Sequence, residues 1–492
     1  MSDLLFAQNR FGLGPRGNQP AGPRDGREWV EAQLGQRLAA LDDVPTRAEA
    51  AEALIAYREE RRDARQNAPA TPATMASGDA MAAPPTMSMA PMPANGAPAR
   101  RAARPPELAA ARRDQRDLYL RAVDARIGAA LTTPTPFLER MAHFWANHFA
   151  VAATKMTTVG YAGLLELDAI RPNLTGRFAD LLLAVEHHPA MLLYLDQAQS
   201  VGPNSTAGQR AESRGRDVGL NENLAREILE LHTLGVRTGY SQADVTEFAR
   251  ALTGWTVAGI GRGPMRRLMS GSSGDFAFAE ILHEPGTRTI LGKRYGEDGE
   301  GQARSVLLDL SVHPATARHI AVKLARHFIA DDPPPAAVSR IEQAFLASRG
   351  DLPTVYRALI AAPEAWQSDR PKFRNPWEWT IASMRALELP APPAQRTVGL
   401  LNELGMPVWR PTSPAGFDDV AASWAGPDAL VRRVEAAGRF ANAAGQGVDA
   451  RALAPRVLGA RLSTATATAI SRAESPATGL ALLLVSPEFL RR

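Results

Sequence analysis

Cysteine is absent from the 492 residues of the chain, and lysine is almost absent. Without cysteine there are no disulfides, no thiolate metal sites and no cysteine nucleophile. Lysine occurs only at Lys155, Lys293, Lys323 and Lys372, so arginine supplies nearly all of the 56 basic residues. The net charge is only +4. A surplus this small gives no reason to expect binding to nucleic acid, which needs clustered positive charge.

The chain also lacks a long apolar run and a leader-like beginning. No stretch reaches the roughly 18 consecutive apolar residues that suggest a membrane-spanning helix. Residues Met1 to Phe6 do not form a basic segment followed by an apolar run, the pattern of a signal peptide. We therefore expect a cytoplasmic protein with no membrane span.

What the chain does contain is ordinary for a globular protein. Hydrophobic residues make up 45% of it and charged residues 22%. Aromatic residues make up 6%, and alanine is abundant, which favours helix over sheet. We predict a predominantly all-α fold, a multi-helix and bundle-like globule. A small irregular segment with short strands is expected near residues 256–300.

Composition divides the chain into four segments. Residues 67–106 are rich in alanine, proline and methionine and hold no aromatic residue, so they cannot bury enough apolar surface to fold. We predict a disordered insertion there. An N-terminal helical segment at 1–66 is expected to pack on a helical core at 107–388, which holds the candidate site. A C-terminal helical segment follows at 389–492.

Helix-start signals recur along the chain. At Asn375-Pro376-Trp377-Glu378 a capping residue, a proline at the first helical position and an acidic third residue agree. Ser241 and Asp244 form a similar cap. Such signals predict helices at 28–41, 46–65, 136–151, 242–253, 314–329 and 351–361, a further helix from Pro376, and short strands at 276–282 and 288–292.

The densest polar constellation runs from Asn221 to His232. One face of a helix here would hold an amide, a guanidinium and two carboxylates: Asn223, Arg226, Glu227 and Glu230. Two carboxylates three residues apart can share a metal ion, or one can raise the pKa of the other to give an acid/base pair. The alternative is a solvated face laced by local ion pairs. His232 falls on the opposite, apolar face, so we expect it behind the site or in the core.

A second polar stripe lies on the predicted helix at 136–151. Glu139, His143 and Asn147 are spaced four residues apart and share one face. This order suits metal ligation, or a histidine oriented by a carboxylate, with Glu139 behind His143. The alternative is an aromatic core face in which Glu139 and His143 form a structural pair. His148 points away from this stripe.

A set of long strings covers nearly the whole chain apart from 67–106. They are Arg10 to Pro15, Phe144 to Phe149, Gly219 to Gly235, Gly239 to Val245, Leu252 to Trp255, His283 to Gly286, Leu291 to Lys293, His313 to Ala317, Lys323 to Phe328 and Ser486 to Phe489. These strings resemble the bacterial family called domain of unknown function 1800. The resemblance implies a mostly helical protein of unassigned activity.

The same resemblance gives weight to the polar residues inside the strings. These are Asn147, His148, Asn223, Arg226, Glu227, His232 and His283. We take Asn147, Asn223 and Trp255 as substrate-binding candidates. Genes of the family often neighbour those of a second uncharacterised family, domain of unknown function 1501, which looks like an exported sulfatase or phosphatase relative. A protein partner from that family is therefore implied.

Two functional hypotheses follow. In the first, the chain is a hydrolase- or transferase-type enzyme acting on an anionic or sugar-like substrate. Its catalytic groups would be Arg226 as an anion clamp, Glu227 and Glu230 as carboxylates, and His148 and His283 as acid/base partners. A divalent metal ion held by His143 and Glu227 is part of this hypothesis. In the second, the chain is a non-catalytic binding or assembly partner, and the polar stripe is a network that fixes helix registry.

Overall fold

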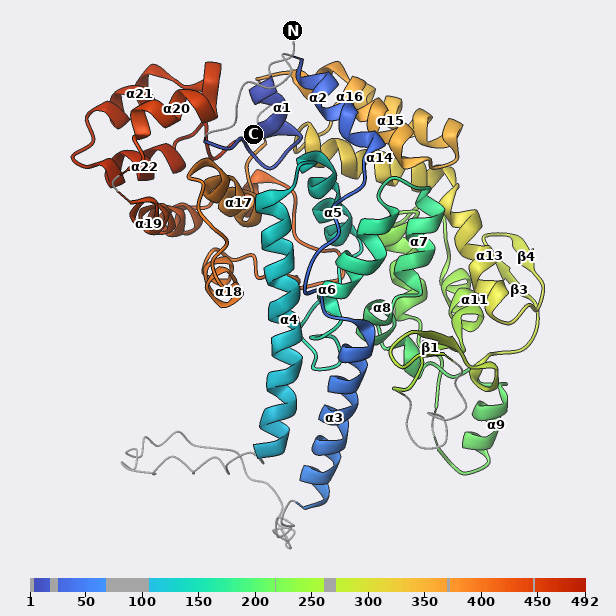
Figure 1. Ribbon diagram of the computed structural model, residues 1–492. Helices are drawn as coiled ribbons and strands as arrows, with labels where there is room; N and C mark the ends of the chain where they lie inside the picture. Colours follow the sequence, from blue (N-terminus) through green and yellow to red (C-terminus); the bar gives the residue numbers. More distant parts are fainter. Residues whose placement is uncertain are drawn as a thin grey trace, which may run out of the picture.

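Helices make up most of the molecule (Figure 1). The computed structural model describes residues 4–17, 25–67, 106–216, 218–260, 271–369, 372–445 and 447–492. Within these ranges the strands form only two two-stranded antiparallel sheets. The predicted all-α fold is therefore confirmed. The predicted disordered insertion, apart from its two end residues, lies outside the described part of the chain.

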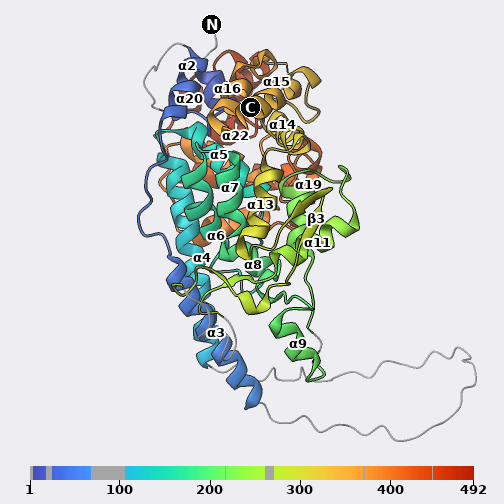
Figure 2. The same ribbon diagram turned by 90° about the vertical axis from the view of Figure 1, so that its right-hand side faces the viewer.

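The regular elements in the described residues up to Leu252 are all helices. Its helices are α1 Leu4–Arg10, α2 Gly26–Glu31, α3 Arg47–Gln66, α4 Pro106–Thr132, α5 Pro136–His148, α6 Ala162–Leu164, α7 Phe178–Glu186, α8 Pro189–Tyr194, α9 Thr206–Glu212, α10 Asn223–Glu227 and α11 Gln242–Leu252. The long helices α3 and α4 lie side by side (Figures 1 and 2).

The helix predicted at 28–41 is wrong over its second half. Helix α2 ends at Glu31, a short 3-10 helix occupies Ala32–Gly35, and Gln36 is extended. The 3-10 helix ends at Gly35, a residue type that costs about 1 kcal/mol relative to alanine inside a helix.

The second half of the chain contains the strands and the remaining helices. They are β1 Trp255–Val257, β2 Phe276–Phe278, β3 Arg288–Ile290, β4 Lys293–Tyr295, α13 Glu300–Ser311, α14 Pro314–Phe328, α15 Pro335–Ser348, α16 Leu352–Ala361, α17 Pro376–Ala386, α18 Ala394–Glu403, α19 Pro427–Ala444, α20 Ala450–Leu458, α21 Thr464–Ser471 and α22 Pro476–Leu484. Strand β1 pairs with β2, and β3 with β4 through Leu291 and Gly292, both at positive φ as a tight hairpin turn requires.

Side-chain caps begin the helices where the sequence predicts them. Complete capping boxes open α3, α11 and α17. In the last of these, Asn375 Oδ1 accepts a hydrogen bond from the backbone N–H of Glu378 at 2.8 Å. The cap therefore fixes the position of a glutamate whose side chain is buried.

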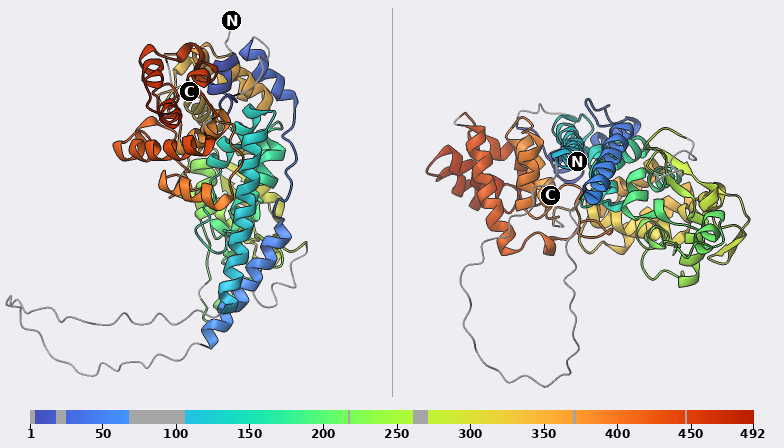
Figure 3. Two further views of the ribbon diagram at one scale, coloured as in Figure 1. Left: turned by 60° about the vertical axis from the view of Figure 1, so that its left-hand side comes forward. Right: turned by 90° about the horizontal axis from the view of Figure 1, so that it is seen from below.

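Buried apolar side chains form two clusters, and α17 takes part in both. Trp377 and Ile381 belong to the larger cluster, which is built mainly from the elements before α17. Trp379 and Ala382 belong to the smaller cluster, which is built mainly from α19 to α22. These C-terminal helices lie together at one end of the molecule, with α17 between them and the rest (Figures 1 and 3). No helix of the described residues is long and apolar enough to cross a membrane.

Candidate functional site

A cavity of about 210 Å³ lies among α4, α5, α14, α17 and the loop at 406–419. Aromatic and apolar side chains form part of its wall, including those of Trp377, Trp409 and Phe417. The charged and histidine side chains that line it are Arg126, Arg140, His143, His148, Lys323, Arg326, His327, Glu378, Asp418 and Asp419. Convergent polar groups in a partly apolar hollow are what a small-molecule site requires, so we take this cavity as the candidate site.

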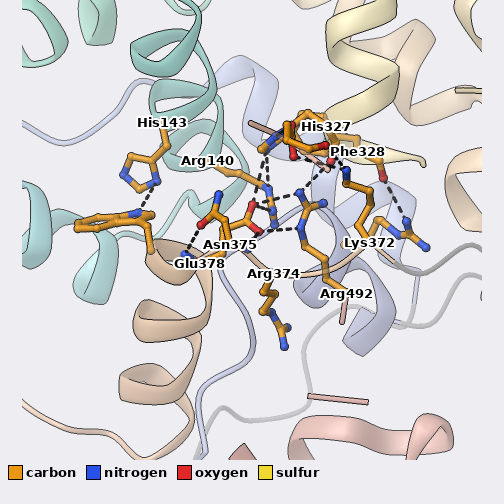
Figure 4. Close-up of polar contacts among 12 residues, drawn as sticks. Arg140, His143, His327, Phe328, Lys372, Arg374, Asn375, Glu378 and Arg492 are labelled. Carbon is orange, nitrogen blue, oxygen red and sulfur yellow. Dashed lines mark hydrogen bonds and ion pairs between the residues drawn. The ribbon is translucent and has the colours of Figure 1, made fainter. Parts of the chain in front are cut away.

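A buried network of ion pairs lies along one side of the cavity (Figure 4). Glu378 is paired with Arg140, and with Arg492 through bonds of 3.0 and 3.1 Å. Arg140 Nε donates to His327 Nε2 at 3.2 Å, and His327 Nδ1 donates to Asp419 Oδ2 at 2.6 Å. Both ring nitrogens of His327 are therefore engaged, which leaves it no lone pair for chemistry in the cavity.

The guanidinium groups control the charge of Glu378. Burial alone would raise the pKa of this carboxyl, but Arg140 and Arg492 lower it to about 2. Burial would also raise the pKa of Asp419, and His327 and Lys372 lower it further than burial raises it. Both carboxylates are therefore ionised in the folded protein at any physiological pH.

We expect the protein to lose stability steeply in acid because of this network. The pKa of Glu378 falls from its ordinary value of 4.5 to about 2 on folding. Its contribution is therefore fully present above about pH 4.5 and is lost as the pH falls toward 2. Glu378 alone contributes on the order of 3 kcal/mol. Urea unfolding of the wild type and Glu378→Gln between pH 2 and 7 measures this, and parallel pH profiles of the two proteins would contradict it.

His143 is oriented by two neighbours. Trp377 Nε1 donates to its Nδ1 at 3.2 Å (Figure 4), so the proton of the neutral ring lies on Nε2, which faces Glu139 Oε1 at 3.6 Å. Glu139 is buried and accepts a bond of 2.5 Å from Arg171. Burial, and then the charge of Arg126, hold the pKa of His143 well below its usual value. His143 is thus neutral, with its lone pair already bound by Trp377.

His148 differs from the other two histidines of the cavity. Its Nε2 lies 3.1 Å from the backbone oxygen of His232, and because a carbonyl can only accept, Nε2 carries the proton. The lone pair of the neutral ring is then on Nδ1, a buried atom with no hydrogen-bond partner among the described residues. Burial, and then the charge of Lys323, hold the pKa of His148 well below its usual value. His148 is therefore the cavity histidine whose lone pair has no hydrogen-bond partner among the described residues.

The carbonyl that orients His148 comes from the segment that carries the predicted stripe. Helix α10 gives way at Ile228 to a π-helix, Ile228–His232. His148 Nε2 bonds to the oxygen of His232, and His319 Nε2 bonds to the oxygen of Leu231, each at 3.1 Å. Short π-helical turns are frequent at functional sites. The carbonyls of this π-helical turn orient the rings of His148 and His319.

The side chains of the stripe itself do not line the cavity. Arg226 pairs with Glu222 at 3.2 Å and with Glu230 at 3.5 Å, both one helical turn away. Asn223 is exposed. Glu227 is half-buried, and burial raises its pKa. The structure therefore places Arg226 and Glu230 in local ion pairs, and no side chain of the stripe lines the cavity.

Three further candidates also lie outside the cavity lining. His283 Nδ1 donates to the backbone oxygen of Thr253 at 2.8 Å. Trp255 is buried in β1 among aromatic side chains. His232 is buried with its Nδ1 2.7 Å from Glu186 Oε1. The structure thus brings His143, Asn147 and His148 together in the cavity, and leaves the other candidates elsewhere.

Asn147 holds the loop that forms one wall of the cavity. It accepts a hydrogen bond from the backbone N–H of Phe417 at 2.7 Å and donates one to the backbone oxygen of Phe417 at 2.9 Å. Gly416 has a φ of 82°, and a Cβ there would lie 2.2 Å from the backbone oxygen of Asn147. Only glycine permits this approach. Asn147 therefore shapes the cavity by positioning its wall.

Four cationic groups of the cavity were not singled out from the sequence: Arg140, described above, and Arg126, Lys323 and Arg326. Arg126 lies between two indoles, 4.2 Å from the ring centre of Trp377 and 5.2 Å from that of Trp409. Its Nε faces Glu166 Oε1 at 3.0 Å, while neither Nη atom donates a hydrogen bond to a described residue. Nothing in the local sequence of a 27-residue helix marks this arginine.

Lys323 and Arg326 follow one another by one turn of α14. Arg326 Nε donates to the backbone oxygen of Asp331 at 3.2 Å. For Lys323 there is neither a hydrogen bond nor an ion pair within the part of the chain that the structure describes. Two signals in the sequence could have pointed to this residue: the scarcity of lysine and the position of Lys323 at the start of the family-like string Lys323 to Phe328.

The residues predicted as metal ligands are not brought together. His143 lines the cavity, whereas Glu227 does not. Among the described residues, no group of three or more histidine, aspartate or glutamate side chains is placed to hold a metal ion.

Comparison with known proteins gives one match. The family model described as "Protein of unknown function (DUF1800)" matches residues 7–491. No curated protein and no solved structure matches the chain significantly. The match fits the resemblance of the sequence strings, and it brings no activity from a relative.

Proposed function

Since the chain belongs to the DUF1800 family of proteins of unknown function along nearly its whole length, we propose a function from its own cavity. We propose a hydrolase- or transferase-type enzyme that binds a small anionic substrate and uses His148 as general base. The observation that carries the proposal is the buried lone pair on His148 Nδ1, at the wall of a cavity lined by cations.

The case for an anionic substrate rests on donors that no described residue uses. The Nη atoms of Arg126 have no hydrogen-bond acceptor in the described part of the chain, and neither has Lys323 Nζ. A guanidinium presents parallel N–H groups that match a carboxylate or a phosphate. The indoles of Trp377 and Trp409 hold Arg126 in place. A donor fixed in this way loses little conformational freedom when a ligand binds.

The case for His148 rests on its fixed tautomer. The carbonyl of His232 holds the proton on Nε2, so Nδ1 is free to take a proton from a water molecule or a hydroxyl group. Burial, and then the charge of Lys323, lower the pKa of His148. A bound anion would offset that charge and raise the pKa of His148. His148 would then become a better base when the substrate is present.

Binding of small anions tests the first half of the proposal. We expect inorganic phosphate or succinate to bind the wild type, and Arg126→Lys to weaken binding at least about tenfold, because lysine keeps the charge but loses the paired N–H groups. Isothermal titration calorimetry measures this. The matched control is Arg121→Lys on the same helix, whose partners Asp43 and Glu49 lie outside the cavity lining.

Equal affinities for wild type, Arg126→Lys and Arg121→Lys would contradict the anion site. Failure of every anion to bind the wild type would favour the alternative function, a non-catalytic partner of a protein from the domain of unknown function 1501 family. In that role the buried network would serve folding alone.

A further inference from the structure

We propose that Lys323 is a nucleophile that forms a Schiff base with a small carbonyl compound bearing an anionic group, such as a 2-oxo acid. The inference rests on the proposed function, because it assigns a substrate class to the same cavity. Within the proposed function, a Schiff base on Lys323 indicates a transferase whose transferred group contains the carbonyl carbon.

The four lysines of the chain differ in their ion pairing. Three of them are neutralised by carboxylates: Lys155 by Asp196, Lys293 by Asp309 and Lys372 by Asp331. Lys323 alone has no ion pair with a described residue. The other basic residues of the chain are arginines, which do not lose their proton in proteins. The chain thus keeps, at the wall of its cavity, the one kind of cation that can become a neutral amine.

The surroundings of the Lys323 amine favour its neutral form. Burial, and then the charge of Arg326 one turn along α14, lower the pKa of Lys323 to about 8, against the opposing effect of Asp419. Part of the Lys323 amine is therefore in its neutral, nucleophilic form near physiological pH. Desolvation and a neighbouring cation are the two devices that activate lysine as a nucleophile.

The proton acceptor for the Lys323 amine would be His148 Nδ1. Lys323 follows His319 by one turn of α14, and the ring centre of His319 lies 5.9 Å from that of His148. The charge of Lys323 is also the largest charge effect on the pKa of His148. Lys323 and His148 both line the cavity.

The reaction balances without a further reagent. The neutral amine of Lys323 attacks the carbonyl carbon, a C–N bond forms, and the π electrons of the C=O bond move to oxygen. His148 Nδ1 takes the proton that the nitrogen loses and returns one to the hydroxyl group. The C–O bond then breaks, one water molecule leaves and the imine remains. The free donors of Arg126 would hold the carboxylate of the same substrate.

Reductive trapping tests the proposal on the whole protein. Glyoxylate, an aldehyde with a carboxylate, is added with sodium cyanoborohydride, and the four lysines are followed by peptide mass spectrometry. We expect Lys323 to gain the mass of glyoxylic acid less one oxygen atom at least about tenfold faster than Lys155 or Lys293, as an activated amine should. Lys323→Arg should lose this adduct, and Lys155→Arg should keep it.

Two outcomes would overturn the proposal. Modification of Lys323 no faster than that of Lys155 and Lys293 would remove Lys323 as the nucleophile. Equal rates with glyoxylate and with uncharged glycolaldehyde would remove the anionic group from the substrate class. Either result, alongside anion binding that still depends on Arg126, would leave the proposed function standing. Should Lys323→Arg not fold, Lys323→Met provides the same loss of the amine without the larger side chain.

Discussion

Replacing Glu378 by glutamine is expected to destabilise the protein by about 3–5 kcal/mol. The variant keeps the size of the side chain but leaves Arg140 and Arg492 buried without their shared carboxylate. Removing one partner of a buried ion pair costs far more than an exposed pair contributes, because the remaining charge has lost its hydration and gains nothing in return. Here two guanidinium groups lose their partner at once.

Urea unfolding at pH 7 measures this loss. The matched control is Glu403→Gln, which breaks an ion pair of 2.6 Å with Arg439 in which both side chains are 54% exposed. An exposed pair contributes at most about 1 kcal/mol, so this variant should unfold close to the wild type. Similar losses for the two variants would show that the network at Glu378 has no special role in stability.

Glu378 also shows how far the sequence carried the prediction of the fold. A local signal, the capping box with Asn375, correctly predicted the start of α17 and the backbone position of Glu378. The partners of its side chain come from residues 140 and 492, far away in the chain. Capping depends on four neighbouring residues, whereas the network depends on how α5, α17 and the C-terminal residues pack. Only the first kind of information lies in a short stretch of sequence.

The predicted stripe at Asn221–His232 shows a different limit. A rotation of 100° per residue holds only in an α-helix, but the segment becomes a π-helix at Ile228. The group of this segment that reaches a cavity histidine is the backbone oxygen of His232, which bonds to His148. Backbone carbonyls are the same in every residue, so no pattern of side chains reveals them.

The second stripe shows which features the spacing of residues along a helix predicts and which it does not. Glu139, His143 and Asn147 lie on one helix as predicted, yet each meets a different partner: Arg171, Trp377 and the backbone of Phe417. Spacing along a helix predicts which side chains share a face. It does not predict what that face meets, because the neighbours come from distant parts of the chain.

His148→Gln is expected to reduce turnover by about 10²–10⁴-fold, the usual contribution of a general base. The glutamine amide reaches as far as Nε2 of the imidazole and can still donate to the backbone oxygen of His232. It has no counterpart of the Nδ1 lone pair, which is the feature of His148 that the proposed function requires. His148→Gln thus removes the proposed base and keeps the hydrogen bond to the backbone oxygen of His232.

The measurement is the rate for the ester turned over fastest in a hydrolysis screen of small carboxylate- and phosphate-bearing esters. His319→Gln is the matched control, because His319 makes the same 3.1 Å bond to the neighbouring carbonyl of Leu231 without lining the cavity. It should keep nearly full turnover, and both variants should bind phosphate as the wild type does. Equal losses of turnover in the two variants would mean that these histidines only support the π-helix, and His148 would then not be the base.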